Sequence, residues 1–199
     1  MKDLIIKTLS SVENEFSKNE LAYLTLTTKI EHPLRDRWAF SLHKNLEAQN
    51  TFVAREWNRV DIALVKNNKP VALIELKAMY TFDAALLPKN AKGFVENMTQ
   101  DAVKARKLAT DYTNIYTVLL ATHPHKPINS KYRGIVKYDS GINKAFDKYQ
   151  SAEIIKNKAI EEVNINFKSK NVINAGELKG GEAFGIKTSV LYWLVDESE

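Results

Sequence analysis

Two apolar segments that carry three charged residues constrain the fold of this 199-residue chain more than any other feature. They make up the stretch from Arg59 to Lys77, RVDIALVKNNKPVALIELK, and each segment has the length of a β-strand. The turn-forming run KNNKP at 66–70 separates them and predicts a hairpin. The charged residues are Asp61, Glu75 and Lys77, in segments whose apolar character is typical of covered strands.

Side chains alternate between the two faces of a strand, and this alternation groups the three charges. Glu75 and Lys77 point to the same face, and Leu76 points to the other. In an antiparallel hairpin closed at 66–70, Asp61 lies near Glu75 or one residue diagonal to it. Unpaired charge is costly to bury, so such a cluster pairs internally, binds a metal ion or carries out chemistry. The alternative is a surface ion-pair ladder on a half-exposed hairpin.

Hydrophobic periodicity predicts the elements around this hairpin. Helices are expected at 2–16, 33–48, 92–109 and around 143–160, and strands at 51–57, 59–65, 71–77, 114–122, 163–167 and 189–195. Residues 19–28 are expected to form a strand or the approach to the next helix, and 78–90 and 174–185 to form loops. Strands that alternate with helices predict an α/β domain with a mixed central sheet flanked by helices.

Length and composition fit one globular domain over residues 1–199. The chain is 44% hydrophobic and 27% charged, and the lack of cysteine excludes disulfides, thiolate chemistry and cysteine-based zinc sites. No apolar run is long enough to span a membrane, and the N-terminal segment lacks the apolar stretch of a signal peptide. A cytoplasmic protein without membrane partners is therefore expected.

The basic charge is concentrated in one segment. Lys and Arg number 29 against 24 Asp and Glu in the whole chain, a net charge of +5. From Lys126 to Lys170 there are 10 Lys and Arg against 5 acids, which gives the same net +5. Tyrosines are interleaved with these charges, so the segment is predicted to contact DNA through Lys131, Arg133 and Lys137. A solvated helix surface is the alternative.

The spacing of Asp61, Glu75 and Lys77 resembles the motif of the PD-(D/E)XK nuclease superfamily, whose members share the restriction-endonuclease-like fold. Here an aspartate is followed by 13 residues and then by E-x-K on the next strand. Val60 stands where the superfamily name has proline. The expected order of elements is similar as well, because an α-β-β-β-α-β core precedes the basic segment.

This resemblance implies a division of the single nuclease domain. The core would comprise residues of about 30–127 and 189–196, with the last apolar strand closing the sheet. The basic insertion at about 128–188 would contribute to substrate binding. Because cutting both strands of DNA usually takes two active sites, a homodimer or a partner subunit is also expected.

The resemblance further implies roles for the charged residues. Asp61 and Glu75 would be ligands of Mg²⁺, with the backbone carbonyl of Leu76 as a third oxygen, and Mn²⁺ is expected to substitute. A hard divalent cation held by carboxylates polarises a phosphodiester and lowers the pKa of bound water. Lys77 would orient or help to deprotonate that water and stabilise the developing charge.

Members of the superfamily often add an acid from the first core helix, and Glu31 is the candidate here. It stands at the head of the apolar stripe of the helix predicted at 33–48. Arg35, one turn further on, is expected to hold a phosphate. Three other acids, Glu47, Asp36 and Glu56, compete with Glu31 for this role.

Other polar residues have more ordinary expected roles. Asp101 and Lys104 are expected to be surface charges of an amphipathic helix, with contacts behind the catalytic residues as the alternative. His123 and His125 precede prolines and are expected to be structural or solvated, although they have the chemistry to touch metal or phosphate.

The expected function is a Mg²⁺-dependent DNA endonuclease of the restriction-endonuclease type. A recombination, repair or mobile-element nuclease of the same superfamily is the first alternative. A noncatalytic nucleic-acid-binding module with this fold is the second, and an interaction protein with an unrelated α/β fold is the third.

Overall fold

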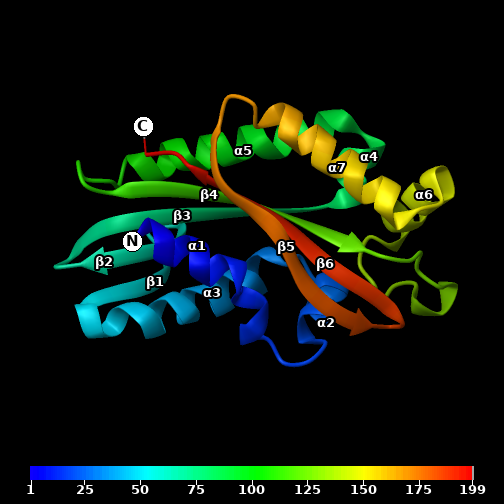
Figure 1. Cartoon of the computed structure of the whole chain (residues 1–199), viewed down its shortest axis with the longest axis horizontal. Coiled ribbons are helices and arrows are strands. Elements are labelled where there is room, and N and C mark those ends of the chain that lie inside the picture. Colours follow the sequence, from blue (N-terminus) through cyan, green and yellow to red (C-terminus); the bar gives the residue numbers. More distant parts are fainter. Residues whose placement is uncertain (199) are drawn as a thin grey trace.

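Six strands form one mixed sheet in the computed structural model, which describes residues 1–198 (Figure 1). The strands are β1 (Thr51–Trp57), β2 (Val60–Lys66), β3 (Lys69–Tyr80), β4 (Asn114–Pro124), β5 (Asn171–Ala183) and β6 (Ile186–Asp196). They lie in the order β1-β2-β3-β4-β6-β5. The β3–β4 pair is parallel, and the other four neighbouring pairs are antiparallel.

Helices cover both faces of this sheet (Figure 1). One face is covered by α1 (Lys2–Ser10), α2 (Glu20–Thr27) and α3 (Glu31–Leu46), and the other by α4 (Thr81–Leu86), α5 (Pro88–Arg106), α6 (Asp139–Tyr149) and α7 (Ala152–Asn166). Short 3-10 helices lie at η1 (Val12–Glu15), η2 (Glu47–Gln49) and η3 (Ser130–Tyr132). Among these helices of residues 1–198, none combines the length and apolar character needed to cross a membrane.

Separate apolar cores fill the space on the two sides of the sheet. On the α3 side, Trp38 and Leu42 pack with Ile74 and Leu76 of β3. On the α5 side, Met98 packs in a cluster that includes residues of β4, β6 and α7. Because both faces are covered, β4 is a nearly continuous apolar run. The predicted α/β class, with a mixed central sheet flanked by helices, is confirmed.

The β2–β3 hairpin is tighter than the predicted loop at 66–70. Its turn consists of Asn67 and Asn68, both with positive φ (51° and 60°), a conformation that asparagine tolerates well. Val65 pairs with Pro70, but Leu64 pairs with Ala72, so the register shifts by one residue next to the turn.

Several predicted boundaries before β4 are wrong. The predicted first helix at 2–16 ends at Ser10 and continues as η1, and residues 19–28 hold the helix α2. The loop predicted at 78–90 is also wrong, because β3 runs to Tyr80 and is followed by α4 and α5. The backbone N–H of Tyr80 donates to the carboxylate of Asp83 at 2.8 Å, which caps the start of α4.

Three predictions in the basic segment are wrong as well. The single helix expected around 143–160 is two helices, because α6 ends at Tyr149 and α7 begins at Ala152. Residues 163–167, predicted as a strand, form the end of α7 and its cap, since Val163 continues the buried helical row of Ile155 and Ala159. The loop predicted at 174–185 coincides with most of β5, which pairs with β6 at the edge of the sheet. The segment that we predict to be an insertion, 128–188, thus supplies α6, α7 and the edge strand β5.

Candidate active site

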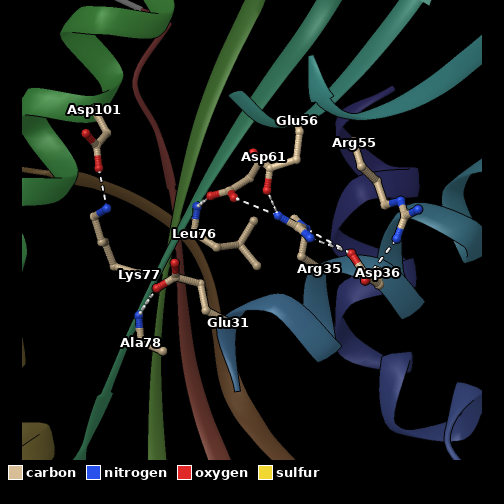
Figure 2. A network of polar contacts seen from close by, with 10 residues as sticks. All are labelled: Glu31, Arg35, Asp36, Arg55, Glu56, Asp61, Leu76, Lys77, Ala78 and Asp101. Atoms are coloured by element: carbon tan, nitrogen blue, oxygen red, sulfur yellow. Dashed lines mark hydrogen bonds and ion pairs between the residues drawn. The ribbon is translucent and has the colours of Figure 1, made fainter. Parts of the chain in front are cut away.

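A cleft of about 430 Å³ lies between the β1–β2 turn and α5. It brings together all four residues predicted to be catalytic, although they come from α3, β2 and β3. Charged side chains dominate its lining: the acids are Glu31, Asp61, Glu75 and Asp101, and the bases are Arg59, Lys77 and Lys104. Figure 2 shows the polar contacts of Glu31, Asp61, Lys77 and Asp101.

Asp61 and Glu75 lie side by side where β2 begins against the middle of β3. Ile62 pairs with Ile74, so one step further along the ladder Asp61 faces Glu75. The Asp61 carboxylate accepts a hydrogen bond of 2.8 Å from the backbone N–H of Leu76 (Figure 2), and its side chain is only 14% exposed. The two carboxyl groups are thus fixed close to one another by the backbone of the hairpin.

The pKa of Glu75 is raised because its carboxyl group is buried and lies so close to that of Asp61. Burial, the neighbouring Asp61 carboxylate and the Asp101 carboxylate together raise the pKa of Glu75 to about 8. Lys77 acts to lower the pKa of Glu75, but burial and the two acids outweigh it. Ionising Glu75 beside Asp61 is therefore unfavourable, because the cleft lacks enough positive charge to balance two carboxylates.

Lys77 is turned towards α5. Its Nζ lies 2.6 Å from the Asp101 carboxylate, whose other oxygen is 2.7 Å from Nζ of Lys104. Burial acts to lower the pKa of Lys77, but the contact with Asp101 raises it above its ordinary value. Lys77 therefore remains a cation in the cleft, held by Asp101 in the arrangement that Figure 2 shows.

Asp101 is one site residue that the sequence interpretation missed, because it was assigned to the helix surface together with Lys104, which also lines the cleft. Its side chain is 14% exposed and lines the cleft. A signal was present in the sequence: Asp101 follows Met98 by three residues and precedes Ala105 by four, so it belongs to the inward-facing stripe of α5.

Glu31 reaches the cleft from the first residue of α3. One of its carboxylate oxygens accepts a hydrogen bond of 3.0 Å from the backbone N–H of Ala78 (Figure 2). None of the three competing acids lines the cleft. Asp36 and Glu56 both contact Arg35, and Glu47 lies in the exposed helix η2, 3.9 Å from His43.

Arg35 is placed differently from the phosphate-holding residue that was predicted. It is only 7% exposed and does not line the cleft. Its guanidinium donates to Asp36 at 2.9 Å, contacts Glu56, and lies 3.6 Å from Asp61 (Figure 2). Arg35 therefore holds Asp61 from behind and is already surrounded by carboxylates.

Lys131, Arg133 and Lys137 lie in the connection that follows β4, and none of them lines the cleft. The Nζ of Lys131 lies 4.8 Å from the ring centre of Tyr132, and Arg133 is 78% exposed and 3.7 Å from Asp139. The structure thus separates the predicted DNA-contact residues from the predicted catalytic residues. A role for them in DNA binding stays a prediction.

The two histidines at the end of β4, His123 within the strand and His125 directly after it, lie outside the cleft. His123 is 1% exposed, and its Nδ1 lies 3.0 Å from the hydroxyl of Thr81. Burial and the neighbouring His125 lower the pKa of His123 to about 3, so it is neutral at physiological pH. His125 contacts the Ser189 hydroxyl at 3.2 Å. These contacts are those of structural side chains.

The cleft supplies two adjacent carboxylates but not a complete cage for a metal ion. Within residues 1–198, no three histidine, aspartate or glutamate side chains are grouped closely enough to hold a metal. A cation at Asp61 and Glu75 would take its remaining ligands from the backbone, water or substrate. Mg²⁺ commonly binds in this way, through one or two carboxylates and substrate phosphates.

Comparisons with known proteins identify no relative of this chain. The chain matches no protein-family model, no curated protein and no solved structure.

Proposed function

We propose that this protein is a Mg²⁺-dependent DNA endonuclease of the PD-(D/E)XK type, related to the restriction endonucleases. The observation that carries the proposal is the meeting of Asp61, Glu75 and Lys77 in one cleft. Two hard-oxygen ligands and a cation are the groups that hydrolysis of a phosphodiester needs. Glu31 lines the same cleft and agrees with the expected acid of the first core helix.

The arrangement of elements supports the same proposal. The order α3, β1, β2, β3, α5, β4 corresponds to the α-β-β-β-α-β core implied by the resemblance, with the short helix α4 added before α5. The strands β1 to β3 are joined by antiparallel hairpins, whereas β3 and β4 are parallel. β6 would be the last strand of the core.

Asp61 and Glu75 fit a divalent cation. Their carboxyl groups touch, and the pKa of Glu75 is raised because burial and the nearby acids outweigh Lys77. A divalent ion would balance this charge, with Asp61, Glu75 and the Leu76 carbonyl as its protein ligands and with Mn²⁺ able to replace Mg²⁺. When bound, the ion would polarise the phosphodiester and make a water molecule easier to deprotonate.

The other residues in and behind the cleft would stabilise charge on the substrate or hold the site in position. The Lys77 ammonium would stabilise negative charge as it develops on the phosphate, because it stays protonated and is held by Asp101. Glu31 fixes β3 just beyond Lys77 through the N–H of Ala78. Arg35 orients Asp61 from behind the strand through an ion pair of 3.6 Å.

A plasmid cleavage assay tests the proposal. Supercoiled DNA is incubated with the wild type, Asp61→Ala and Lys77→Ala in Mg²⁺, with parallel samples in EDTA. Glu47→Ala serves as the control, because it removes an exposed acid outside the cleft. We expect cleavage by the wild type and the control, loss of cleavage in EDTA, and a rate lower by about 10²-fold or more in the two cleft variants.

Two outcomes would count against the proposal in different ways. Cleavage that persists in both Asp61→Ala and Lys77→Ala would mean that these residues are not the active site. If the wild type cuts neither duplex DNA, single-stranded DNA nor RNA, the result would favour a noncatalytic nucleic-acid-binding module.

A further inference from the structure

We propose that Arg59, in the β1–β2 turn, is a phosphate-contacting residue of the cleft that grips the substrate backbone beside the carboxylates. This inference rests on the proposed nuclease function, since it names a substrate contact of the same site. It replaces Arg35, which the sequence suggested for this role. It also places a nucleic-acid contact at the cleft itself, apart from Lys131, Arg133 and Lys137.

The backbone of the turn makes an arginine at this position unexpected. Trp57 pairs with Val60, so Asn58 and Arg59 form a two-residue turn. Both residues have positive φ, 49° for Asn58 and 72° for Arg59. Glycine, asparagine and aspartate are favoured in such turns, and a side chain like that of arginine costs about 1 kcal/mol there.

The neighbouring hairpin shows the ordinary solution. The β2–β3 turn has the same two-residue length and positive φ, and it uses Asn67 and Asn68. The local geometry of the β1–β2 turn therefore does not explain why an arginine stands at position 59. A function for the Arg59 side chain would explain it.

The side chain of Arg59 is available to a ligand. It is exposed and lines the cleft. The other two bases of the cleft, Lys77 and Lys104, are both paired with Asp101. The Arg59 guanidinium, in contrast, forms no ion pair or hydrogen bond with another side chain of residues 1–198. Its fork of N–H donors matches the oxygens of a phosphate.

The position of Arg59 relative to the carboxylates suits a nucleic-acid backbone. Asn58, Arg59 and Val60 contribute to the cleft wall directly before Asp61 in the chain. A phosphodiester bound at Asp61 and Glu75 would have neighbouring phosphates along the strand, and Arg59 stands at the edge of the cleft to receive one. The recognised group is the backbone phosphate, so this contact would carry affinity without reading base sequence.

Equilibrium binding in EDTA tests this contact without cleavage. Fluorescence anisotropy is measured with a labelled duplex of about 30 base pairs, from about 50 to 200 mM salt. Arg59→Gly removes the charge and fits the left-handed turn, Arg59→Asn repeats the loss with a second residue suited to that conformation, and Arg59→Lys keeps the charge. The matched control is Lys66→Gln, which removes an exposed base beside the neighbouring β2–β3 turn and outside the cleft.

We expect Arg59→Gly and Arg59→Asn to weaken binding about five- to tenfold at low salt and to reduce the slope of log K against log salt by about 1. Arg59→Lys should keep the wild-type slope, and both neutral variants should melt at or above the wild-type temperature because turn strain is relieved. In Mg²⁺, KM for plasmid should rise by the same factor while kcat stays within about twofold.

An unchanged affinity and salt slope in Arg59→Gly and Arg59→Asn would overturn the inference, and so would an equal loss in Lys66→Gln. If the wild type cleaves DNA in that case, the nuclease proposal stands and the Arg59 contact alone is wrong. If the wild type neither binds nor cleaves nucleic acid, both are wrong.

Discussion

Asp61 faces Glu75 because the β2–β3 ladder shifts its register by one residue next to the turn. Val65 pairs with Pro70, but Leu64 pairs with Ala72, which leaves Val71 as the extra residue. Without this shift, Asp61 would stand opposite Ile74, and its side chain would lose its place beside Glu75. The contact between the two carboxyl groups thus depends on a local irregularity of the backbone.

This contact predicts an unusual dependence of stability on pH. The pKa of Glu75 is about 8 in the folded protein against an ordinary value of 4.5, so the folded state binds more protons between these values. The free energy of unfolding should therefore fall as pH rises from about 4.5 to about 8. Glu75→Gln, which stays neutral, should be more stable than the wild type by about 2 kcal/mol near pH 9 in EDTA.

Urea denaturation of both proteins at several pH values measures this difference. The two should have nearly equal stability at about pH 3.5 and below, where Glu75 is mostly protonated in both the folded and the unfolded state. A wild type that gains stability relative to Glu75→Gln as pH rises would show that the Glu75 carboxylate is already balanced by a protein cation.

Asp101 is expected to act through Lys77. In Asp101→Asn the Lys77 ammonium loses its charged partner at 2.6 Å, so the pKa of Lys77 should fall and its side chain should be held less firmly. We expect cleavage to slow about tenfold and the alkaline limb of the pH–rate profile to move to lower pH. Asp111→Asn removes an exposed acid in the connection before β4 and is the control. If the alkaline limb lies at the same pH in Asp101→Asn as in the wild type, Asp101 does not act through Lys77.

Glu31 combines a structural contact with a charge, and two substitutions separate them. Glu31→Ala should lower the free energy of unfolding by about 1–2 kcal/mol, because it leaves the buried N–H of Ala78 without its acceptor. Glu31→Gln keeps an acceptor oxygen and should melt like the wild type, yet cleave about tenfold more slowly. Glu47→Gln should change neither quantity. Equal cleavage rates for Glu31→Gln and Glu47→Gln would rule out a contribution from the Glu31 charge.

Arg35 should matter for stability. Replacing it by methionine leaves the carboxylates around it, including Asp61, without their buried cation. We expect a loss of about 3 kcal/mol in the free energy of unfolding. Arg37→Met is the matched control on the same helix, since Arg37 is 45% exposed and pairs with Glu20 at the surface. A similar loss in both variants would show that the burial of Arg35 does not increase its contribution to the free energy of unfolding.

Alternation along the strands was sufficient to predict the central residues of the site. The pleat placed Glu75 and Lys77 on one face, and the turn at 66–70 limited where Asp61 could lie, so their meeting in one cleft was predictable. Glu31 was the candidate among four acids because the resemblance implies an acid from the first core helix and Glu31 stands at the head of the apolar stripe of α3, and it lines the cleft. The fold class followed in the same way, from the alternation of strands with helices.

The sequence did not reveal features that depend on tertiary packing. β5 contains glycines that suggest a loop, but they admit neighbouring side chains: a Cβ on Gly176 would lie 2.6 Å from the Tyr192 hydroxyl oxygen. Neither the register shift at Val71 nor the left-handed turn at Arg59 leaves a periodic signal. Asp101 was missed because a charge on a helix usually faces solvent, although its spacing from Met98 pointed inward.

Isothermal titration calorimetry with Mg²⁺, and in parallel with Mn²⁺, tests the central claim that Asp61 and Glu75 hold one divalent cation together. The titration compares the wild type with Asp61→Asn and Glu75→Gln, two substitutions that keep the shape of each side chain and remove its charge. The wild type should bind about one ion per chain, and each substitution should weaken this binding about tenfold or more. Binding of equal strength in all three proteins would contradict the account.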